Sequence, residues 1–172
     1  MGTIGNLAVT RPEYMISSTD FIELYERHQS AVFRAALRIT GNSADAEDVL
    51  QTVFLKVYAQ GDRPRDEQTA DAYFRRAATN AAIDILRRRS THAEVRIDEV
   101  QPHPAQDSEP LLKEQLRRAI AELAPEDAEL FLLRFVEGFS NGELADLFGQ
   151  EKNNIAVRLH RIRQTLQKAM NR

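Results

Sequence analysis

A polar, acidic stretch from Thr91 to Pro110 divides the chain, because hydrophobic periodicity stops there and resumes only at Leu111. Pro102 and Pro104 also interrupt this stretch, and such a composition is typical of a flexible linker. On both sides of it, apolar residues recur at three- and four-residue steps, and no strand-like alternation of useful length appears. The sequence therefore predicts an all-α fold of two small helical domains joined by a flexible acidic linker.

The two domains share 172 residues, so each has a thin core. The N-terminal end shows no sustained hydrophobic period, and we expect it to be a flexible tail. The expected boundaries are residues 1–18 for the tail, 19–92 for the N-terminal domain, 93–110 for the linker and 111–172 for the C-terminal domain.

The N-terminal domain is expected to contain a first helix from about Asp20 to Gly41, where glycine favours termination. Either Asn42 or Ser43 can cap the second helix, because a short polar side chain accepts hydrogen bonds from the free amides of a first turn. The apolar stripe of that second helix runs to about Tyr58.

The third helical segment follows an expected loop at residues 61–68 and ends in the sequence RRRS at residues 87–90. Asn80 lies in the middle of this segment, and Asn is unfavourable inside helices because its amide competes for backbone hydrogen bonds. The segment is therefore either two helices with a break near Thr79 and Asn80 or one continuous helix with an exposed Asn80. Propensity alone does not separate these alternatives.

The C-terminal domain carries the start and stop signals of a helix-turn-helix. Pro125 suits the first position of a helix that Gly138 would end. Ser140 and Glu143 form an S-x-x-E capping box at the start of the next helix, and Gly149 permits the turn that follows it.

The last helix is expected to have one apolar and one polar face. At roughly 100° per residue, the inward residues are Ile155, Leu159, Ile162 and Leu166. The other side offers amide, imidazole and guanidinium groups that can meet base edges and phosphates in a major groove; its residues are Asn153, Asn154, Val157, Arg158, His160, Arg161 and Gln164. The alternative interpretation is a solvated basic face on the last helix of a bundle.

The charge pattern supports contacts with nucleic acid although the formal net charge is −3. Residues 152–172 contain six Lys or Arg and no acid, and residues 73–96 contain six Arg against two acids. Acidic residues concentrate instead between Glu94 and Glu129. Two basic segments separated by an acidic one indicate two sites for an anionic partner.

Other classes of function lack their sequence signals. The chain has no Cys and four widely spaced His, so we expect no disulfide, no metal site and no cofactor. It has no apolar run near the roughly 20 residues of a membrane span, so we expect no membrane insertion and a cytoplasmic location. A phosphate-cradling glycine loop, a nucleophile–base pair and metal-spaced carboxylates are missing, and we expect that the protein is not an enzyme.

Three stretches resemble the extracytoplasmic-function (ECF, group IV) sigma factors of bacterial RNA polymerase. DAEDVLQTVFLKVY (45–58) is similar to the helix of sigma region 2 that docks on the polymerase clamp, and AYFRRAATNAAIDILRRRS (72–90) to the segment that opens and reads the −10 element. LAPEDAELFLLRFVEGFSNGELADLFG (123–149), followed by NNIAVRLHRIRQTL (153–166), is similar to region 4, which reads the −35 element. The resemblance implies binding to core RNA polymerase and promoter DNA, promoter melting, and an anti-sigma partner.

For the polymerase contact, the resemblance points to Glu47, Asp48 and Gln51. A carboxylate and an amide one helical turn apart can pair with basic and polar groups of a partner helix, although ordinary solvation explains them equally from the residues alone. The family often has an acid where this chain has Thr52, so the contact is expected to depend more on Asp48 and Gln51.

For the −10 element, Asn80 matches the position at which the family receives a base flipped from the non-template strand. An amide can bond a base edge as donor and acceptor. Phosphate contacts are expected from arginines of the same segment, part of which could also be a solvated helix end; these are Arg75, Arg76, Arg87, Arg88 and Arg89. Tyr73 and Phe74 are expected to be core or partly buried.

For the −35 element, the resemblance implies contacts from Asn153, Asn154, Val157, Arg158, His160 and Arg161. This chain departs from the family at Glu151, at Asn153 and Asn154, and at Ala156 and Val157, while Arg158 and Arg161 keep the pattern. These departures lie largely on the outward face, so they should change the DNA sequence that is read.

Two other functions compete with the sigma-factor interpretation. A stand-alone helix-turn-helix regulator would bind duplex DNA tightly by itself and would not bind polymerase as a sigma subunit. An enzyme, for example a nucleotide hydrolase built on a helical bundle, has no motif in its favour.

Overall fold

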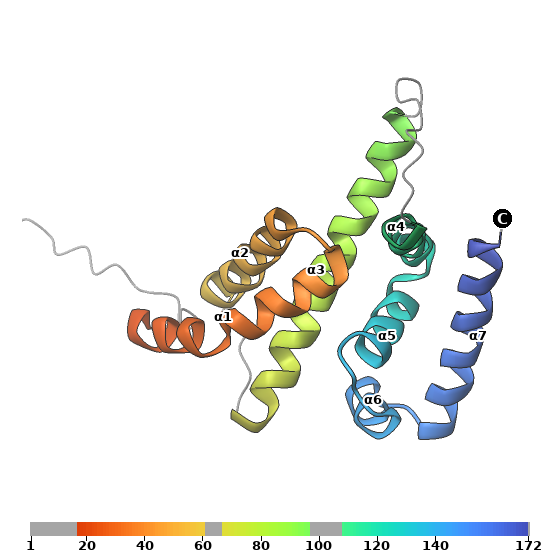
Figure 1. Ribbon diagram of the computed structural model, residues 1–172. Helices are drawn as coiled ribbons and strands as arrows, with labels where there is room; N and C mark the ends of the chain where they lie inside the picture. Colours follow the sequence, from red (N-terminus) through yellow and green to blue (C-terminus); the bar gives the residue numbers. More distant parts are fainter. Residues whose placement is uncertain (1–16, 61–66, 97–107, 172) are drawn as a thin grey trace, which may run out of the picture.

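The computed structural model describes residues 17–60, 67–96 and 108–171, and these ranges form helices without any strand. The helices, in chain order, are α1 (Ser18–Thr40), α2 (Ser43–Gln60), α3 (Glu67–Arg96), α4 (Ser108–Glu122), α5 (Pro125–Phe135), α6 (Asn141–Phe148) and α7 (Lys152–Met170). Figure 1 shows α1, α2 and α3 as one bundle, with α4 to α7 as a second group beside α3. The predicted all-α fold is confirmed.

The turn between α1 and α2 follows the local signals of the sequence. Gly41 adopts the left-handed conformation with φ of 70°, and its N–H donates to the carbonyl of Leu37. The Asn42 side chain accepts a hydrogen bond of 3.1 Å from the Asp45 backbone N–H. Of the two candidate caps, Asn42 therefore performs this role for α2.

Helix α3 is continuous, so the break near Thr79 and Asn80 does not occur. Thr79 is buried, and its hydroxyl donates to the Arg75 carbonyl one turn earlier at 2.9 Å, which satisfies the group inside the helix. Two alanines precede Thr79 and two follow Asn80, and alanine favours helix strongly. The alternative of one uninterrupted helix with an exposed Asn80 is the one observed.

Helical structure reaches further toward the middle of the chain than the periodicity predicted. Helix α3 continues to Arg96, and α4 begins at Ser108 with Pro110 in its first turn. Proline is tolerated there because the first N–H groups of a helix have no intrahelical acceptor. Most of the expected loop at 61–68, and the centre of the expected linker, residues 97–107, lie outside the described residues.

The core of the first bundle is built around an aromatic stack. The Phe74 side chain is fully buried, and its ring centroid lies 5.4 Å from that of Phe54 and 4.4 Å from that of His28. Tyr73 is half-buried, with its ring edge-on to Phe74. Both aromatic side chains thus belong to the core, as predicted, and fix the rotation of α3 in the bundle.

The second group forms the predicted helix-turn-helix. Pro125 begins α5, although this helix ends at Phe135 and Gly138 adopts its left-handed conformation only in the following turn. The Ser140 hydroxyl accepts from the Glu143 N–H at 3.2 Å, and the Glu143 carboxylate accepts from the Ser140 N–H at 2.7 Å. These two hydrogen bonds confirm the capping box. The Ser140 hydroxyl and the Ser140 backbone N–H, both beside the Glu143 carboxylate, lower the pKa of that group from its usual value.

The two groups of helices pack against each other along α3, which contacts both α4 and α5. Arg117 of α4 donates to the Ile39 carbonyl at 2.9 Å, and its guanidinium lies where a Cβ on Gly41 would collide with it. Arg87 of α3 donates to the Leu123 carbonyl at 2.8 Å. These contacts place the basic face of α3 next to α5.

Candidate nucleic-acid interfaces

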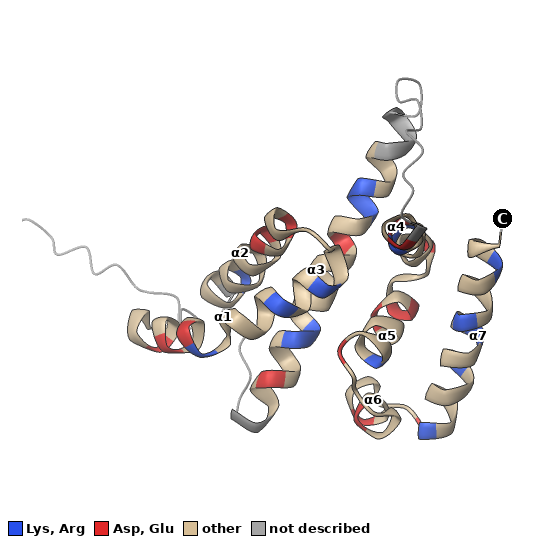
Figure 2. Cartoon of the chain, viewed as in Figure 1, with Lys and Arg blue, Asp and Glu red and all other residues tan. Residues whose placement is uncertain are grey.

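Helix α7 presents the exposed polar face that the sequence predicted. Ile155, Leu159, Ile162 and Leu166 are buried against the rest of the domain. This leaves Asn153, Asn154, Val157, His160 and Arg161 exposed. Figure 2 shows basic positions but no acidic one along α7. Such a face can approach an anionic groove without like-charge repulsion.

Helix α6 and its turn determine how α7 is presented. The capping box fixes the start of α6, Leu144 anchors it in the core, and Gly149 ends it in the left-handed conformation with φ of 61°. Helix α7 starts three residues later, at Lys152. A short turn with a glycine leaves little freedom between the helices, as groove reading by the second helix requires.

Arg158 differs from the other residues of the predicted −35 set, because its guanidinium is held by α5. Its Nε donates to Asp127 at 2.6 Å and its Nη2 to Glu126 at 3.3 Å. The side chain is 24% exposed. Arg158 therefore joins α7 to the start of α5, and the contact with DNA expected from the sequence would require it to leave these two carboxylates.

The predicted polymerase-binding residues form one exposed patch on α2. The side chains of Glu47, Asp48 and Gln51 are exposed, and none makes a hydrogen bond or ion pair with the described parts of the chain. Beside them, Phe33 and Leu50 contribute apolar surface to a shallow groove between α1 and α2. An acidic and amide patch bordering apolar surface can accept a helix that carries basic residues.

The predicted −10 residues divide into two groups. Arg88 is exposed, and its guanidinium donates a hydrogen bond to the Asp84 carbonyl of its own helix. Arg87 donates to Leu123 across the domain boundary, and Arg89 pairs with Asp45 in its own domain. Arg87 and Arg89 thus have protein partners in this structure.

The other group consists of Arg75, Arg76 and Asn80, which lie on the face of α3 turned toward α5. Asn80 and Arg76 border a cavity of about 300 Å³ between α2 and α3 that Lys56 and Tyr73 also line. This volume is at the small end of the range for ligand pockets. A cationic, partly aromatic cavity next to an amide has the chemistry to hold a single base.

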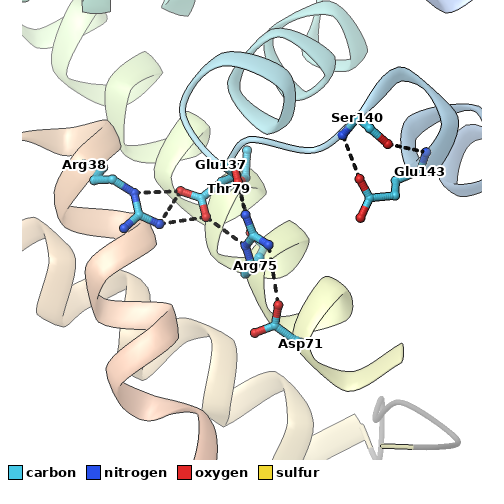
Figure 3. Close-up of polar contacts among 7 residues, drawn as sticks. All are labelled: Arg38, Asp71, Arg75, Thr79, Glu137, Ser140 and Glu143. Atoms are coloured by element: carbon cyan, nitrogen blue, oxygen red, sulfur yellow. Dashed lines mark hydrogen bonds and ion pairs between the residues drawn. The ribbon is translucent and has the colours of Figure 1, made fainter. Parts of the chain in front are cut away.

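Three residues of this region were missed by the sequence interpretation: Arg38, Glu129 and Glu137. Figure 3 shows the Glu137 carboxylate between the guanidinium groups of Arg38 and Arg75. Glu129 shares the buried face of α5 with Leu132 and Leu133, three and four residues later. A carboxylate in an apolar stripe requires a buried partner, and this signal could have identified Glu129.

Comparison with known proteins identifies the family. The family model described as Sigma-70 region 2 matches residues 24–92, and that described as Sigma-70, region 4 matches residues 113–166. The RNA polymerase sigma factor CarQ of Myxococcus xanthus is 34% identical over 146 residues, which cover 82% of this chain and 83% of CarQ. The chain belongs to the ECF sigma-factor family.

A further relative agrees with this assignment, and a solved structure agrees with the fold. The ECF RNA polymerase sigma factor SigE of Mycolicibacterium smegmatis is 32% identical over 154 residues, covering 84% of this chain and 59% of SigE. The fold resembles that of the sigma factor RpoE in its co-crystal structure with the anti-sigma factor NepR from Bartonella quintana. That match has a TM-score of 0.52 and 23% identity, and covers 89% of this chain and 98% of RpoE.

The protein is thus an alternative sigma factor, a class that acts in transcription initiation, and the interpretation as a stand-alone regulator is not favoured. In this sigma factor, region 2 spans α1 to α3 and region 4 spans α4 to α7. No helix in the described ranges is long and apolar enough to cross a membrane. Among these same residues, no group of three or more metal-binding side chains occurs.

Proposed function

We propose that this sigma factor binds core RNA polymerase in the cytoplasm, places α7 in the −35 element and uses the Asn80 face of α3 at the −10 element. The observation that carries the proposal is the acid-free, exposed amide and arginine face of α7 behind a capped turn. The matches to both sigma regions support the view that this face acts on promoter DNA together with RNA polymerase.

Region 4 reads DNA through the outward residues of α7. Asn153 and Asn154 offer amides for base edges, and Arg161 offers a guanidinium for a phosphate or a guanine. Val157 is 52% exposed, and an apolar side chain at that place can contact a thymine methyl group. The −35 sequence preference of this protein is therefore assigned to the positions at which it departs from its family.

Region 2 opens the −10 element through binding free energy, without a cofactor. Unstacking one base costs only a few kcal/mol, and the cavity beside Asn80, lined in part by Lys56, Tyr73 and Arg76, can hold that base. Arg88 and the neighbouring arginines provide phosphate contacts, which add affinity without sequence selection. Asn80 supplies the selection.

Polymerase docks on the patch formed by Glu47, Asp48 and Gln51. These side chains are exposed and have no partner in the described parts of the chain, so docking costs no internal hydrogen bond. An anti-sigma factor is a further expected partner, by analogy with the RpoE–NepR complex.

The direct test is run-off transcription with purified core enzyme on a library of genomic promoters. We expect promoter-dependent transcripts from the wild type and their loss from an Asp48→Arg/Gln51→Ala variant. An Ala59→Ser variant serves as the control and should retain activity, because Ala59 is exposed on the same helix and lies outside both the patch and the cavity beside Asn80. Absence of transcripts from the wild type on every promoter would refute the proposal, and retention of duplex binding without polymerase would then favour a stand-alone regulator.

A further inference from the structure

The face of α3 proposed to bind the −10 strand is partly covered by region 4 in this structure. Arg75 and Arg76 are 26% and 37% exposed, and each pairs with a carboxylate from region 4. Asn80 donates its side-chain amide to the same carboxylate as Arg76, that of Glu129. The three side chains assigned to the −10 strand, those of Arg75, Arg76 and Asn80, thus each contact a carboxylate of the same chain.

Glu137 is the more deeply buried of the two carboxylates. Its side chain is fully buried, and its oxygens accept hydrogen bonds of 2.8 Å from Arg38 Nη2 and 3.0 Å from Arg75 Nε. Arg75 also donates to the backbone carbonyl of Glu137. A carboxylate that is buried away from water is stable only when hydrogen-bond donors such as these arginines replace its hydration shell. The contact therefore favours a packed arrangement of the two regions over a separated one only while both arginines remain in place.

Glu129 makes the second contact from α5. Its Oε1 lies 2.5 Å from Arg76 Nε and 3.1 Å from Asn80 Nδ2. Aromatic rings of region 4 cover the same two arginines, with the Phe139 ring centroid 4.4 Å from Arg75 Cζ and the Phe148 centroid 5.1 Å from Arg76 Cζ. Each cation thus has both a carboxylate and a ring from region 4.

We propose that Glu129 and Glu137 act as an internal competitor for the −10 strand, so that the free sigma factor masks its own region 2. This inference rests on the function proposed for the Asn80 face. Carboxylate and phosphate oxygens offer guanidinium groups the same paired acceptors. A single strand must therefore compete with Glu129 and Glu137 for the side-chain donors of Arg75, Arg76 and Asn80.

When only a fraction of the molecules is open, the apparent affinity for DNA equals the affinity of the open form multiplied by that fraction. If one molecule in ten is open, the apparent Kd is about tenfold weaker than that of the open form. Removal of the Glu129 and Glu137 charges should therefore raise the apparent affinity for DNA by about the same factor.

The test measures the separation of the two regions and the binding of DNA on the same full-length chain. Because the chain has no Cys, Ala59→Cys on α2 and Gln167→Cys on α7, both exposed, can carry a spin-label pair for pulsed electron resonance. The binding probe is a fluorescent, random-sequence single-stranded oligonucleotide, since masking does not depend on sequence.

Two variants open the masked form in different ways. Glu129→Gln/Glu137→Gln removes both carboxylate charges, whereas Arg38→Gln weakens the Glu137 contact without altering any residue assigned to DNA. The matched control is Glu122→Gln/Asp146→Asn, which removes two exposed charges of region 4 that have no partner in the described residues. Circular dichroism verifies that each variant is folded.

We expect one short distance in the wild type and a longer, broader distribution in both opening variants. Affinity for the strand should rise about tenfold over the control for the double variant and rise less for Arg38→Gln. An unchanged distance distribution in both opening variants would overturn the inference, as would an affinity gain no larger than that of the control. If the regions separate and strand binding rises while transcription with core enzyme is absent, the masking stands and the proposed function fails.

Discussion

Arg158 and Arg161 are one turn apart on α7, and the structure predicts that their removal has different consequences. Arg161 is exposed, and its guanidinium has no partner among the described residues, so it is free to contact a phosphate. Arg158 is held by Asp127 and Glu126, and its charge is already balanced within region 4. We predict that Arg161→Ala weakens DNA binding and that Arg158→Ala weakens region 4 itself.

The magnitudes follow from these environments. One lost phosphate contact reduces the slope of log K against log salt by about 0.9, and an exposed residue without partners changes the free energy of unfolding by less than about 0.5 kcal/mol. For Arg158, two partly exposed ion pairs together contribute on the order of 1 kcal/mol to stability. The Arg158→Ala variant should therefore lose about that much, with little change of the salt slope.

The assay combines urea unfolding of each variant with holoenzyme binding to a promoter duplex, measured over a series of salt concentrations. Lys168→Ala, near the C-terminal end of α7, is the control for loss of one positive charge. The reasoning is refuted if Arg158→Ala flattens the salt slope as much as Arg161→Ala does while leaving the unfolding curve unchanged. That result would mean that Arg158 leaves its acidic partners and contacts phosphate.

Three further predictions concern other parts of the molecule. Asn80→Ala should reduce transcription most at promoters with the preferred −10 base, and an equal reduction for every base at that position, in run-off assays, would contradict base capture. Ile155→Ala should lower the free energy of unfolding of region 4 by about 2–5 kcal/mol and Ile155→Val by about 0.5–1.5 kcal/mol in urea titrations, because the side chain is fully buried. The pKa of the Glu143 carboxyl is lowered chiefly by the Ser140 hydroxyl. The ionised carboxylate therefore stabilises the folded state at pH values above its usual pKa of 4.5. This stabilisation is lost as the pH falls through the lower pKa of the folded state. Thermal unfolding should show the stability difference between wild type and Glu143→Gln shrinking on acidification below about pH 4.5, and a difference that stays constant with pH would contradict the capping-box role.

The features that the sequence predicted correctly are those that a few neighbouring residues encode. The Ser140 and Glu143 capping box depends on residues three apart, and the Gly149 turn depends on one conformational preference. The buried stripe of α7 follows from helical periodicity alone, which is why Ile155 and Leu166 were placed correctly.

The features that it did not predict depend on residues far apart in the chain. Arg38 and Glu137 are separated by 99 positions, and no local pattern relates them. Arg158 flanks the outward face on a helical wheel, but in the fold the start of α5 lies beside it and supplies two carboxylates. Helix propensity does not decide whether α3 continues past Asn80. It contributes less free energy than the packing of Phe74 and Thr79 in the core.

Two independent restrictions limit which residue can stand at position 41. Its φ of 70° disfavours any residue with a side chain, whatever surrounds it. The Arg117 guanidinium from region 4 lies where a Cβ would be and would have to shift, a second restriction that applies only while the two regions are packed together. A substitution such as Gly41→Ala would therefore strain the turn in every state of the molecule but would disfavour the packed state additionally. The tolerance of this one position to mutation consequently depends on what the sigma factor is bound to at the time.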